Sequence, residues 1–424
     1  MPPGPAIEGA APLVTEVSIR HRLERRLRIS LFVALCTLLM FGPLALGIVQ
    51  DWSTALFEAG AAVVLLIWMA WQLTACEVRV RWNPLFAPMF VFLGLVLVQI
   101  AFHRSAYLYD SLSELWLYIA YGILVFVAVQ LLRADDILRF GKTMALFGSV
   151  YAVYAVFQGF TSEGRIYWLI KPRAGGVYGS YVNHNHYAGL MELLLPIALV
   201  LAFSGLVRGG KRVLLVFAAT LMAASVFLCQ SRGGMFAVIV ETVFLAIFWM
   251  RQFSPRKSAA VFVAFCLVTA LFLSWIAPQQ VGSRITNIDD PARLLIHRDS
   301  IRMFAAHPFL GSGFGSFAAA FPRYRVFYDG FLINYAHDDY LELLLETGLA
   351  GFGVAVWFIV VLYREGLRNL RPAKLSPVAL ISTAALSGCT GLLAHSFMDF
   401  NLHIPANAAL FYVLCAIATA PHSQ

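Results

Sequence analysis

Length, composition and charge already restrict the class of protein. The chain has 424 residues, of which 60% are hydrophobic and only 13% are charged, whereas about 25% of the residues in a soluble globular domain are charged. This composition excludes a water-soluble protein, a disordered protein and a nucleic-acid-binding module. The net charge of +8 must therefore be interpreted by its location along the chain.

Apolar runs of membrane-spanning length recur from one end of the chain to the other. A transmembrane helix needs about 20 mostly apolar residues, and the runs are 30–49, 53–73, 84–103, 114–132, 138–160, 187–206, 212–229, 233–250, 258–277, 341–363, 376–397 and 404–420. The sequence predicts an all-α, polytopic integral membrane protein with about 12 transmembrane helices. The first run has no small-residue cleavage site, so we expect an uncleaved helix.

The positions of lysine and arginine predict the side of the membrane on which each loop lies. These residues accumulate in cytoplasmic loops, and with the N-terminus inside every short loop on that side is basic. We therefore expect a basic cytoplasmic segment at 1–29, helices 1–9 within 30–277 with an outer loop at 161–186, a long outer loop at 278–340, helices 10–12 within 341–420 and a cytoplasmic end at 421–424. The positive charge then serves orientation and contact with anionic lipids.

Histidine and cysteine are distributed differently along this topology. None of the six cysteines forms a CxxC pair, so neither a disulfide framework nor a zinc site is indicated. Of the ten histidines only His21 and His422 fall on the cytoplasmic side. Polar chemistry is thus concentrated on the outer face, away from ATP, and an enzyme working there needs a substrate that is already activated.

The first outer loop carries basic residues and then amides. Arg165 and Arg173 are followed by Asn183, His184 and Asn185 directly before helix 6. One interpretation is an anion-binding wall with hydrogen-bonding groups for sugar or phosphate at a helix start. The alternative is an interfacial loop that touches lipid headgroups, with an asparagine capping the helix.

A second candidate lies in the tight outer turn between helices 7 and 8. Arg232 follows Ser231 and precedes Gly233 and Gly234. An arginine placed there can point inward at a phosphate, or its side chain can snorkel into the headgroups.

The long loop 278–340 contains its own structural signals. Residues 290–317 predict an amphipathic helix that ends at His307-Pro308, with Arg302 among its arginines. Gly311, Gly313 and Gly315 follow a helix instead of joining a strand to one, which favours a simple turn over a dinucleotide-binding loop.

The most suggestive cluster begins at His337 and enters helix 10. His337 is followed by Asp338 and Asp339, which allows an oriented general base, a structural role, or half of a metal site without a second half nearby. Glu346 lies within the helix, where an unpaired carboxylate is costly, so we expect a histidine or arginine partner. His395, Asp399, Asn401 and His403 gather near the outer end of helix 11.

These motifs occur in an order that resembles the O-antigen ligase and O-antigen polymerase superfamily. The ordered set is Asn183-His184-Asn185, Ser231-Arg232-Gly233-Gly234, the Arg/His-Pro-x-x-Gly-x-Gly segment, and His337 followed by Glu346-x-Gly348-x-x-Gly351. The resemblance extends from about residue 158 to residue 403. One departure is Asp338, where the ligase pattern usually has an amide or a serine.

The resemblance implies an activity and a location. The enzyme would transfer a glycan from undecaprenyl diphosphate to a sugar hydroxyl of the lipid A-core oligosaccharide, in lipopolysaccharide biosynthesis. Transfer would invert the anomeric centre, need no metal or other cofactor, and occur on the periplasmic face of the bacterial inner membrane. The fold would be related to the lipid-linked-sugar glycosyltransferases, the GT-C-like enzymes.

Residue roles follow from the motifs and the chemistry that this reaction requires. A diphosphate leaving group needs positive charge, and an attacking hydroxyl needs a proton acceptor. We expect His337 as the base and Arg232 in the catalytic centre, with diphosphate contacts from Arg165, Arg173, Arg302 and Arg232. Contacts to donor or acceptor sugars are assigned to Asn183, His184, Asn185, Asp338 and Glu346.

Two other functions compete with ligation. A polymerase of the same superfamily would differ only in its acceptor, a second lipid-linked unit. A transporter or lipid flippase should have a polar site near the membrane midplane. Here the predicted helix centres are nearly uncharged, with Glu58 and Glu241 as the main exceptions, which favours catalysis at one rim.

Overall fold

The fold is a bundle of long helices that matches the expected sequence of apolar runs. The structure is a computed structural model, and it describes residues 10–75, 78–172, 176–252, 291–328, 330, 332–370 and 376–421, with the single positions 263, 266, 267, 269 and 271. In chain order the main helices are α1 (Ala10–Leu44), α2 (Asp51–Ala75), α3 (Phe86–Ala101), α4 (Leu108–Leu131), α5 (Ala134–Thr161), α6 (His184–Phe203), α7 (Gly210–Leu228), α8 (Arg232–Gln252), α11 (Pro291–Ala306), α12 (Phe317–Ala320), α13 (Asp339–Asn369), α14 (Pro377–His395) and α15 (Pro405–Ala418).

The all-α, polytopic architecture is confirmed. Nine helices of the described residues are long and apolar enough to cross a membrane, and α3 and α15 are shorter apolar helices. Together they account for every expected run except 258–277, most of which lies outside the described residues. No strand occurs in the part of the chain that the structure describes.

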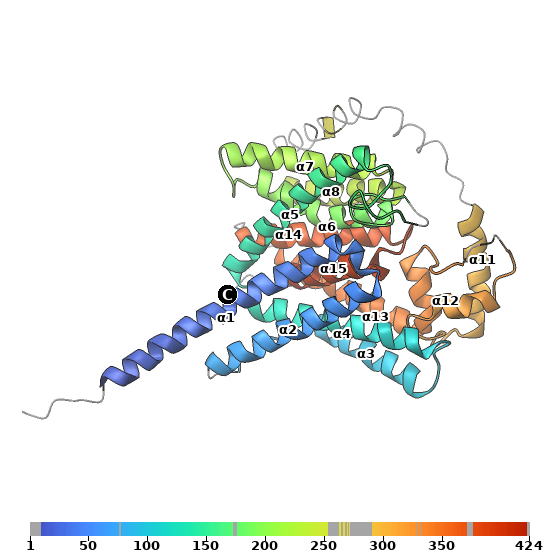
Figure 1. Cartoon of the computed structure of the whole chain (residues 1–424), viewed down its shortest axis with the longest axis horizontal. Coiled ribbons are helices and arrows are strands. Elements are labelled where there is room, and N and C mark those ends of the chain that lie inside the picture. Colours follow the sequence, from blue (N-terminus) through green and yellow to red (C-terminus); the bar gives the residue numbers. More distant parts are fainter. Residues whose placement is uncertain are drawn as a thin grey trace, which may run out of the picture.

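Helices α6 and α14 form the centre of the bundle. Figure 1 shows them between a group containing α5, α7 and α8 and a group containing α1 to α4. Small residues allow this close approach: a Cβ at Gly388 of α14 would lie 3.0 Å from the Glu192 carbonyl oxygen of α6. Since lipid tails are as apolar as leucine, such close packing contributes much of the attraction between membrane helices.

Helix ends gather at two opposite faces of the bundle. At the first, which we call the histidine face, the Asn407 side chain donates to the His186 carbonyl oxygen over 2.8 Å, and the Asp339 backbone N–H donates to the Ser396 carbonyl oxygen over 2.9 Å. At the second, which we call the arginine face, Arg28 pairs with Asp136. The expected outer loops described here meet at the histidine face.

The short loops of the arginine face are tied together by polar contacts. The Arg81 backbone N–H donates to the Gln130 amide oxygen over 2.7 Å, which joins the α2–α3 loop to α4. The Asn83 side chain donates to the Thr419 hydroxyl over 3.0 Å, which joins the same loop to the end of α15. These contacts put the basic α2–α3 loop on the same face as the ends of α4 and α15.

The long loop after α8 begins its described part with α11, and the expected helix ending before His307-Pro308 is confirmed. The glycine turn that follows packs on α13. Gly348 breaks the regular geometry of α13 with a φ of 63°, and a Cβ there would lie 2.3 Å from the Phe309 carbonyl carbon. Only glycine combines this left-handed conformation with such a close backbone approach, so α11 is fixed against α13.

Candidate functional site

The histidine predicted as a base faces a buried carboxylate. His337 Nδ1 lies 3.5 Å from Asp399 Oδ1, and the His337 side chain is 34% exposed while that of Asp399 is 0% exposed. His337 has a left-handed backbone with a φ of 58°, a costly conformation that is concentrated at functional sites. With Nδ1 turned toward Asp399, the Nε2 atom is the one available to accept a proton.

The histidines around Asp399 favour the ionised form of its carboxylate. Burial alone would raise the pKa of Asp399, but the interaction with His337 and the nearby rings of His186 and His395 lower it well below its usual range. Neither carboxylate oxygen has a close hydrogen-bond donor within the described residues. An anionic Asp399 therefore remains free to stabilise a protonated His337.

Phe400 forms the apolar floor of this cluster. The ring of His186 meets Phe400 edge-on with a centroid distance of 4.8 Å, and the ring of His337 does so at 5.0 Å. Tyr335 stacks on Phe400 at 4.0 Å with an interplanar angle of 12°. We call His186, His337, His395, Asp399 and Phe400 the histidine cluster.

The third histidine of the cluster links it to the turn that carries Arg232. His395 Nδ1 lies 2.8 Å from Glu192 Oε1 of α6, and both side chains are buried. A Cβ at Gly233 would lie 2.3 Å from His395 Cδ2. Any larger residue at 233 would displace the imidazole, so the glycine after Arg232 serves the close packing of α8 against His395.

Arg232 is the first residue of α8 and its side chain is exposed. The Ser231 hydroxyl accepts a hydrogen bond from the Gly234 backbone N–H over 3.1 Å, which caps the helix start. Because Gly234 packs on Ala188 of α6, the turn is held rigidly against the bundle. No ion pair to Arg232 occurs among the residues that the structure describes, so its charge is available to an anion.

The aspartates after His337 have structural contacts. The Asp338 carboxylate accepts from the Tyr340 and Leu341 backbone N–H groups, each over 3.0 Å, and so caps α13. The Asp339 carboxylate accepts from the Ser396 hydroxyl over 2.7 Å and approaches His403 Nδ1 to 2.7 Å. These bonds fix the His337 loop to the end of α14 and to the segment before α15.

Glu346 has a charged neighbour of the expected kind and two backbone donors. We expected a histidine or arginine near it, and the imidazole of His403 interacts electrostatically with its carboxylate. Its two oxygens also accept from the backbone N–H groups of Gly315 and Phe317, each over 2.8 Å. Glu346 thereby fastens the turn after α11 to α13.

A cavity of about 620 Å³ adjoins the histidine cluster. We call it the acidic cavity, because its lining includes six carboxylate residues together with four aromatic residues and a histidine: Asp51, Glu58, Asp110, Glu114, Glu342, Glu346, Tyr109, Trp116, Phe317, Tyr335 and His403. Tyr335, which stacks on Phe400, is the shared wall between the cavity and the cluster. The arrangement offers many acceptors for hydroxyl groups.

His403 carries positive charge into the acidic cavity. Burial alone would lower the pKa of His403, but the carboxylates of Glu342 and Asp339 raise it well above its usual value. Its Nε2 lies 3.5 Å from Glu342 Oε1. A protonated imidazole therefore partly balances the carboxylates of this cavity.

The other predicted arginines have different surroundings. Arg302 lies on the exposed side of α11, 3.5 Å from the carboxylate of Asp299. Arg165 is exposed after α5, and Arg173 lies outside the described residues. The structure therefore packs the turn that carries Arg232 on the histidine cluster through Gly233 and His395, and records no contact of Arg165 or Arg302 with the cluster among the described residues.

The amides before α6 fulfil the capping interpretation. Asn183 precedes the helix, and its side-chain oxygen accepts from the Asn185 backbone N–H over 2.9 Å. His184 Nδ1 lies 3.3 Å from the Gly176 carbonyl oxygen. The side chains of His184 and Asn185 remain half-buried at the histidine face, where both can meet a ligand.

Sequence reasoning missed several residues of the site. Arg293, not Arg302, reaches the loop that carries Asp399, since its Nη1 donates to the Met398 carbonyl oxygen over 2.6 Å. Glu114 of the cavity and Glu192 of the cluster were also missed. Each is an acidic residue in an apolar helix, and such residues are functional candidates by default, so a stricter reading of α4 and α6 could have found both.

Comparison with known proteins agrees with the resemblance. Residues 217–356 match the model of the family described as O-antigen ligase. The matched segment contains Arg232 and His337. No curated protein matches the chain. Within the described residues, no three histidine, cysteine, aspartate or glutamate side chains converge as a metal site requires.

Proposed function

We propose that the chain, whose residues 217–356 match the O-antigen ligase family model, transfers a glycan from undecaprenyl diphosphate to a sugar hydroxyl of lipid A-core oligosaccharide. The reaction takes place at the histidine face, on the periplasmic side of the bacterial inner membrane. The observation that carries this proposal is the His337–Asp399 pair, which is joined through His395 to the turn bearing the exposed Arg232.

Charge separates the two substrates at this face. A diphosphate is strongly anionic, so the donor binds on the side of the exposed Arg232 and not among the carboxyl groups of the acidic cavity. The guanidinium group of Arg232 can form paired hydrogen bonds with phosphate oxygens. It stabilises the negative charge that grows on the leaving diphosphate.

The acceptor sugar fits the acidic cavity. Its carboxylates accept hydrogen bonds from sugar hydroxyls, and Trp116, Tyr109 and Tyr335 offer aromatic faces to the sugar ring. Because Tyr335 also touches the floor of the histidine cluster, a sugar at this wall can present one hydroxyl to His337. Glu346 and Asp338 then support the site through backbone contacts.

The chemical step follows from these positions. His337 Nε2 accepts the proton of the acceptor hydroxyl while the hydroxyl oxygen forms a bond to the anomeric carbon of the donor. The bond from that carbon to the diphosphate oxygen breaks, and undecaprenyl diphosphate leaves with the electron pair. Asp399 stabilises the imidazolium ion that results. Attack opposite the leaving group inverts the anomeric configuration.

The test is transfer by purified protein without ATP. The protein is given an undecaprenyl-diphosphate-linked glycan with rough lipopolysaccharide, and in parallel with a second lipid-linked unit as the only acceptor. We expect a new glycosidic bond on the lipopolysaccharide and release of undecaprenyl diphosphate. Transfer only to the lipid-linked unit would establish a polymerase. Movement of the donor across proteoliposomes without bond formation would establish a transporter.

A further inference from the structure

A second cavity opens at the opposite face of the bundle, far from the chemistry proposed above. It has a volume of about 520 Å³ and lies where the α2–α3 loop, the α4–α5 junction, the start of α14 and the end of α15 meet. We call it the arginine cavity, because its only charged lining residues in the described chain are Arg81 and Arg133. No group of the histidine cluster lines it.

The two arginines are unequal in their local partners. Arg81 is fixed by Gln130, whose carbonyl oxygen accepts from its guanidinium group and whose side-chain amide donates to the Arg81 carbonyl oxygen over 2.9 Å. Arg133 precedes α5 with an exposed side chain. The nearby carboxylate of Asp136 is engaged by Arg28. No described aspartate or glutamate lines the cavity.

The guanidinium groups of Arg81, Arg133 and Arg28 are close enough to repel one another. Burial lowers the pKa of Arg81, and the charges of Arg133 and Arg28 lower it further, whereas Asp136 opposes them. The first residue of α5, Ala134, also lines the cavity, so the partial positive charge of a helix N-terminus adds to both guanidinium groups. An anion in the cavity would relieve this repulsion.

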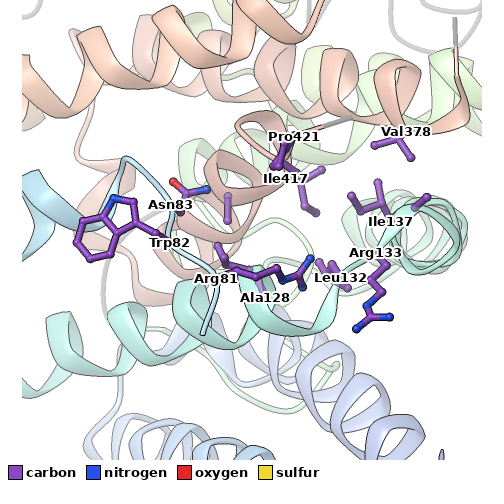
Figure 2. A pocket seen from close by; sticks show the side chains of 14 residues that line it. Arg81, Trp82, Asn83, Ala128, Leu132, Arg133, Ile137, Val378, Ile417 and Pro421 are labelled. Atoms are coloured by element: carbon purple, nitrogen blue, oxygen red, sulfur yellow. The ribbon is translucent and has the colours of Figure 1, made fainter. Parts of the chain in front are cut away.

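Apart from Asn83, the rest of the wall is apolar and faces the two arginines. Figure 2 shows Ile417, Pro421 and Val378 on one side of the cavity and the Arg81 side chain on the other, reaching from the loop of Trp82 and Asn83 toward Leu132 and Arg133. Apolar residues contribute nothing to the binding of a small soluble anion. A lipid presents a phosphate and an acyl chain together.

We infer that the arginine cavity binds the phosphodiester headgroup of an anionic phospholipid, with the first part of an acyl chain against Ile417 and Val378. Basic pockets between transmembrane helices are suited to such headgroups. The inference rests on the charge and shape of the cavity and is independent of the proposed transferase activity.

The experiment is a titration of the purified full-length protein in detergent with phosphatidylglycerol or phosphatidylcholine, followed by native mass spectrometry. We expect the first phosphatidylglycerol to bind more tightly than phosphatidylcholine. Removal of one arginine should weaken that binding about fivefold, and the variants are Arg133→Gln alone and Arg81→Gln with Arg133→Gln. The single variant keeps the test valid if loss of the Arg81–Gln130 contacts disturbs folding.

The matched control is Arg139→Gln. Arg139 is an exposed arginine of α5, the helix that Arg133 precedes, and it does not line the cavity. It should bind phosphatidylglycerol as the unmodified protein does. Equal affinity for the two lipids, unchanged affinity in Arg133→Gln, or an equal loss in Arg139→Gln would overturn the inference. Displacement of phosphatidylglycerol by millimolar glycerol 3-phosphate or inorganic phosphate would also overturn it, because the site would then be one for soluble phosphate.

Discussion

The acidic cavity and the arginine cavity are of similar size but opposite charge. Their volumes are about 620 Å³ and 520 Å³. The first is lined by carboxylates and shares Tyr335 with the histidine cluster, whereas the second is lined by Arg81, Arg133, Asn83 and apolar residues. Volume alone would not distinguish a catalytic site from a lipid site. The neighbouring groups do, because only the first cavity adjoins a proton acceptor.

The difference in lining between the two cavities is the reason that glycan transfer is assigned to the histidine face. Among the described residues that line the arginine cavity there is no histidine, aspartate or glutamate, so it can hold an anion but cannot exchange a proton near neutral pH. At the histidine face, His337 and Asp399 supply that exchange and Arg232 supplies positive charge. If the two faces divide the work in this way, substitutions at the histidine face change transfer and those at the arginine face do not.

The largest effect is expected from the base. His337→Ala should lower the rate of glycan transfer by about 10²–10⁴-fold, because the acceptor hydroxyl then lacks its proton acceptor, while the protein still inserts in the membrane and folds. Transfer assays on purified protein measure this, with His307→Ala, an exposed histidine of the same face, as the control. Full activity in His337→Ala would remove it as the base.

The next effect is expected from the diphosphate contact. Arg232→Ala should reduce transfer by about 10²-fold, and Arg232→Lys should retain more activity since a positive charge remains but the paired hydrogen bonds are lost. The exposed Arg323 on the same face provides the control, Arg323→Ala. Unmodified turnover by Arg232→Ala would contradict the diphosphate role.

A smaller effect concerns stability and pH at the acidic cavity. The folded-state pKa of His403 is raised above its usual value, so its contribution to stability is complete below about pH 6.5 and is lost as the pH rises toward the raised value. The free energy of unfolding should fall in this window by at most about 1.4 kcal/mol per pH unit. Unfolding of the detergent-solubilised protein measures it, and His403→Gln should show a flatter profile. An equal slope in His403→Gln would refute the assignment.

The smallest effect is expected from chelation. EDTA should leave the transfer rate unchanged, because arginine supplies the charge that a metal would otherwise provide at the leaving group. The measurement compares initial rates with and without the chelator. Strong inhibition that a divalent cation reverses would show that a metal ion, and not arginine, stabilises the charge on the leaving diphosphate.

Features that depend on local pattern could be predicted from the sequence. The lengths of the apolar runs predicted the helices, and a cap at the asparagine before α6 was one of two interpretations of that segment. The helix before His307-Pro308 and the glycine turn after it also followed from spacing. Each of these signals lies within a few residues of the feature that it determines.

Pairings between distant segments could not be predicted in the same way. The Glu346 carboxylate accepts hydrogen bonds from the backbone N–H groups of Gly315 and Phe317. Glu192 of α6 pairs with His395 of α14. The stacking of Tyr335 on Phe400 joins two loops that the sequence places 65 positions apart. Such contacts depend on how helices pack, so a single sequence predicts the residue types but not their partners.

The central claim is that the face carrying His337 and Arg232 lies outside the cytoplasm, where it meets a lipid-linked donor that is already activated. The most direct measurement labels single cysteines in spheroplasts with a membrane-impermeant maleimide, after replacement of the native cysteines. His307→Cys on the histidine face should be labelled in intact spheroplasts, and Arg139→Cys on the arginine face only after the membrane is permeabilised. The reverse pattern would contradict the account.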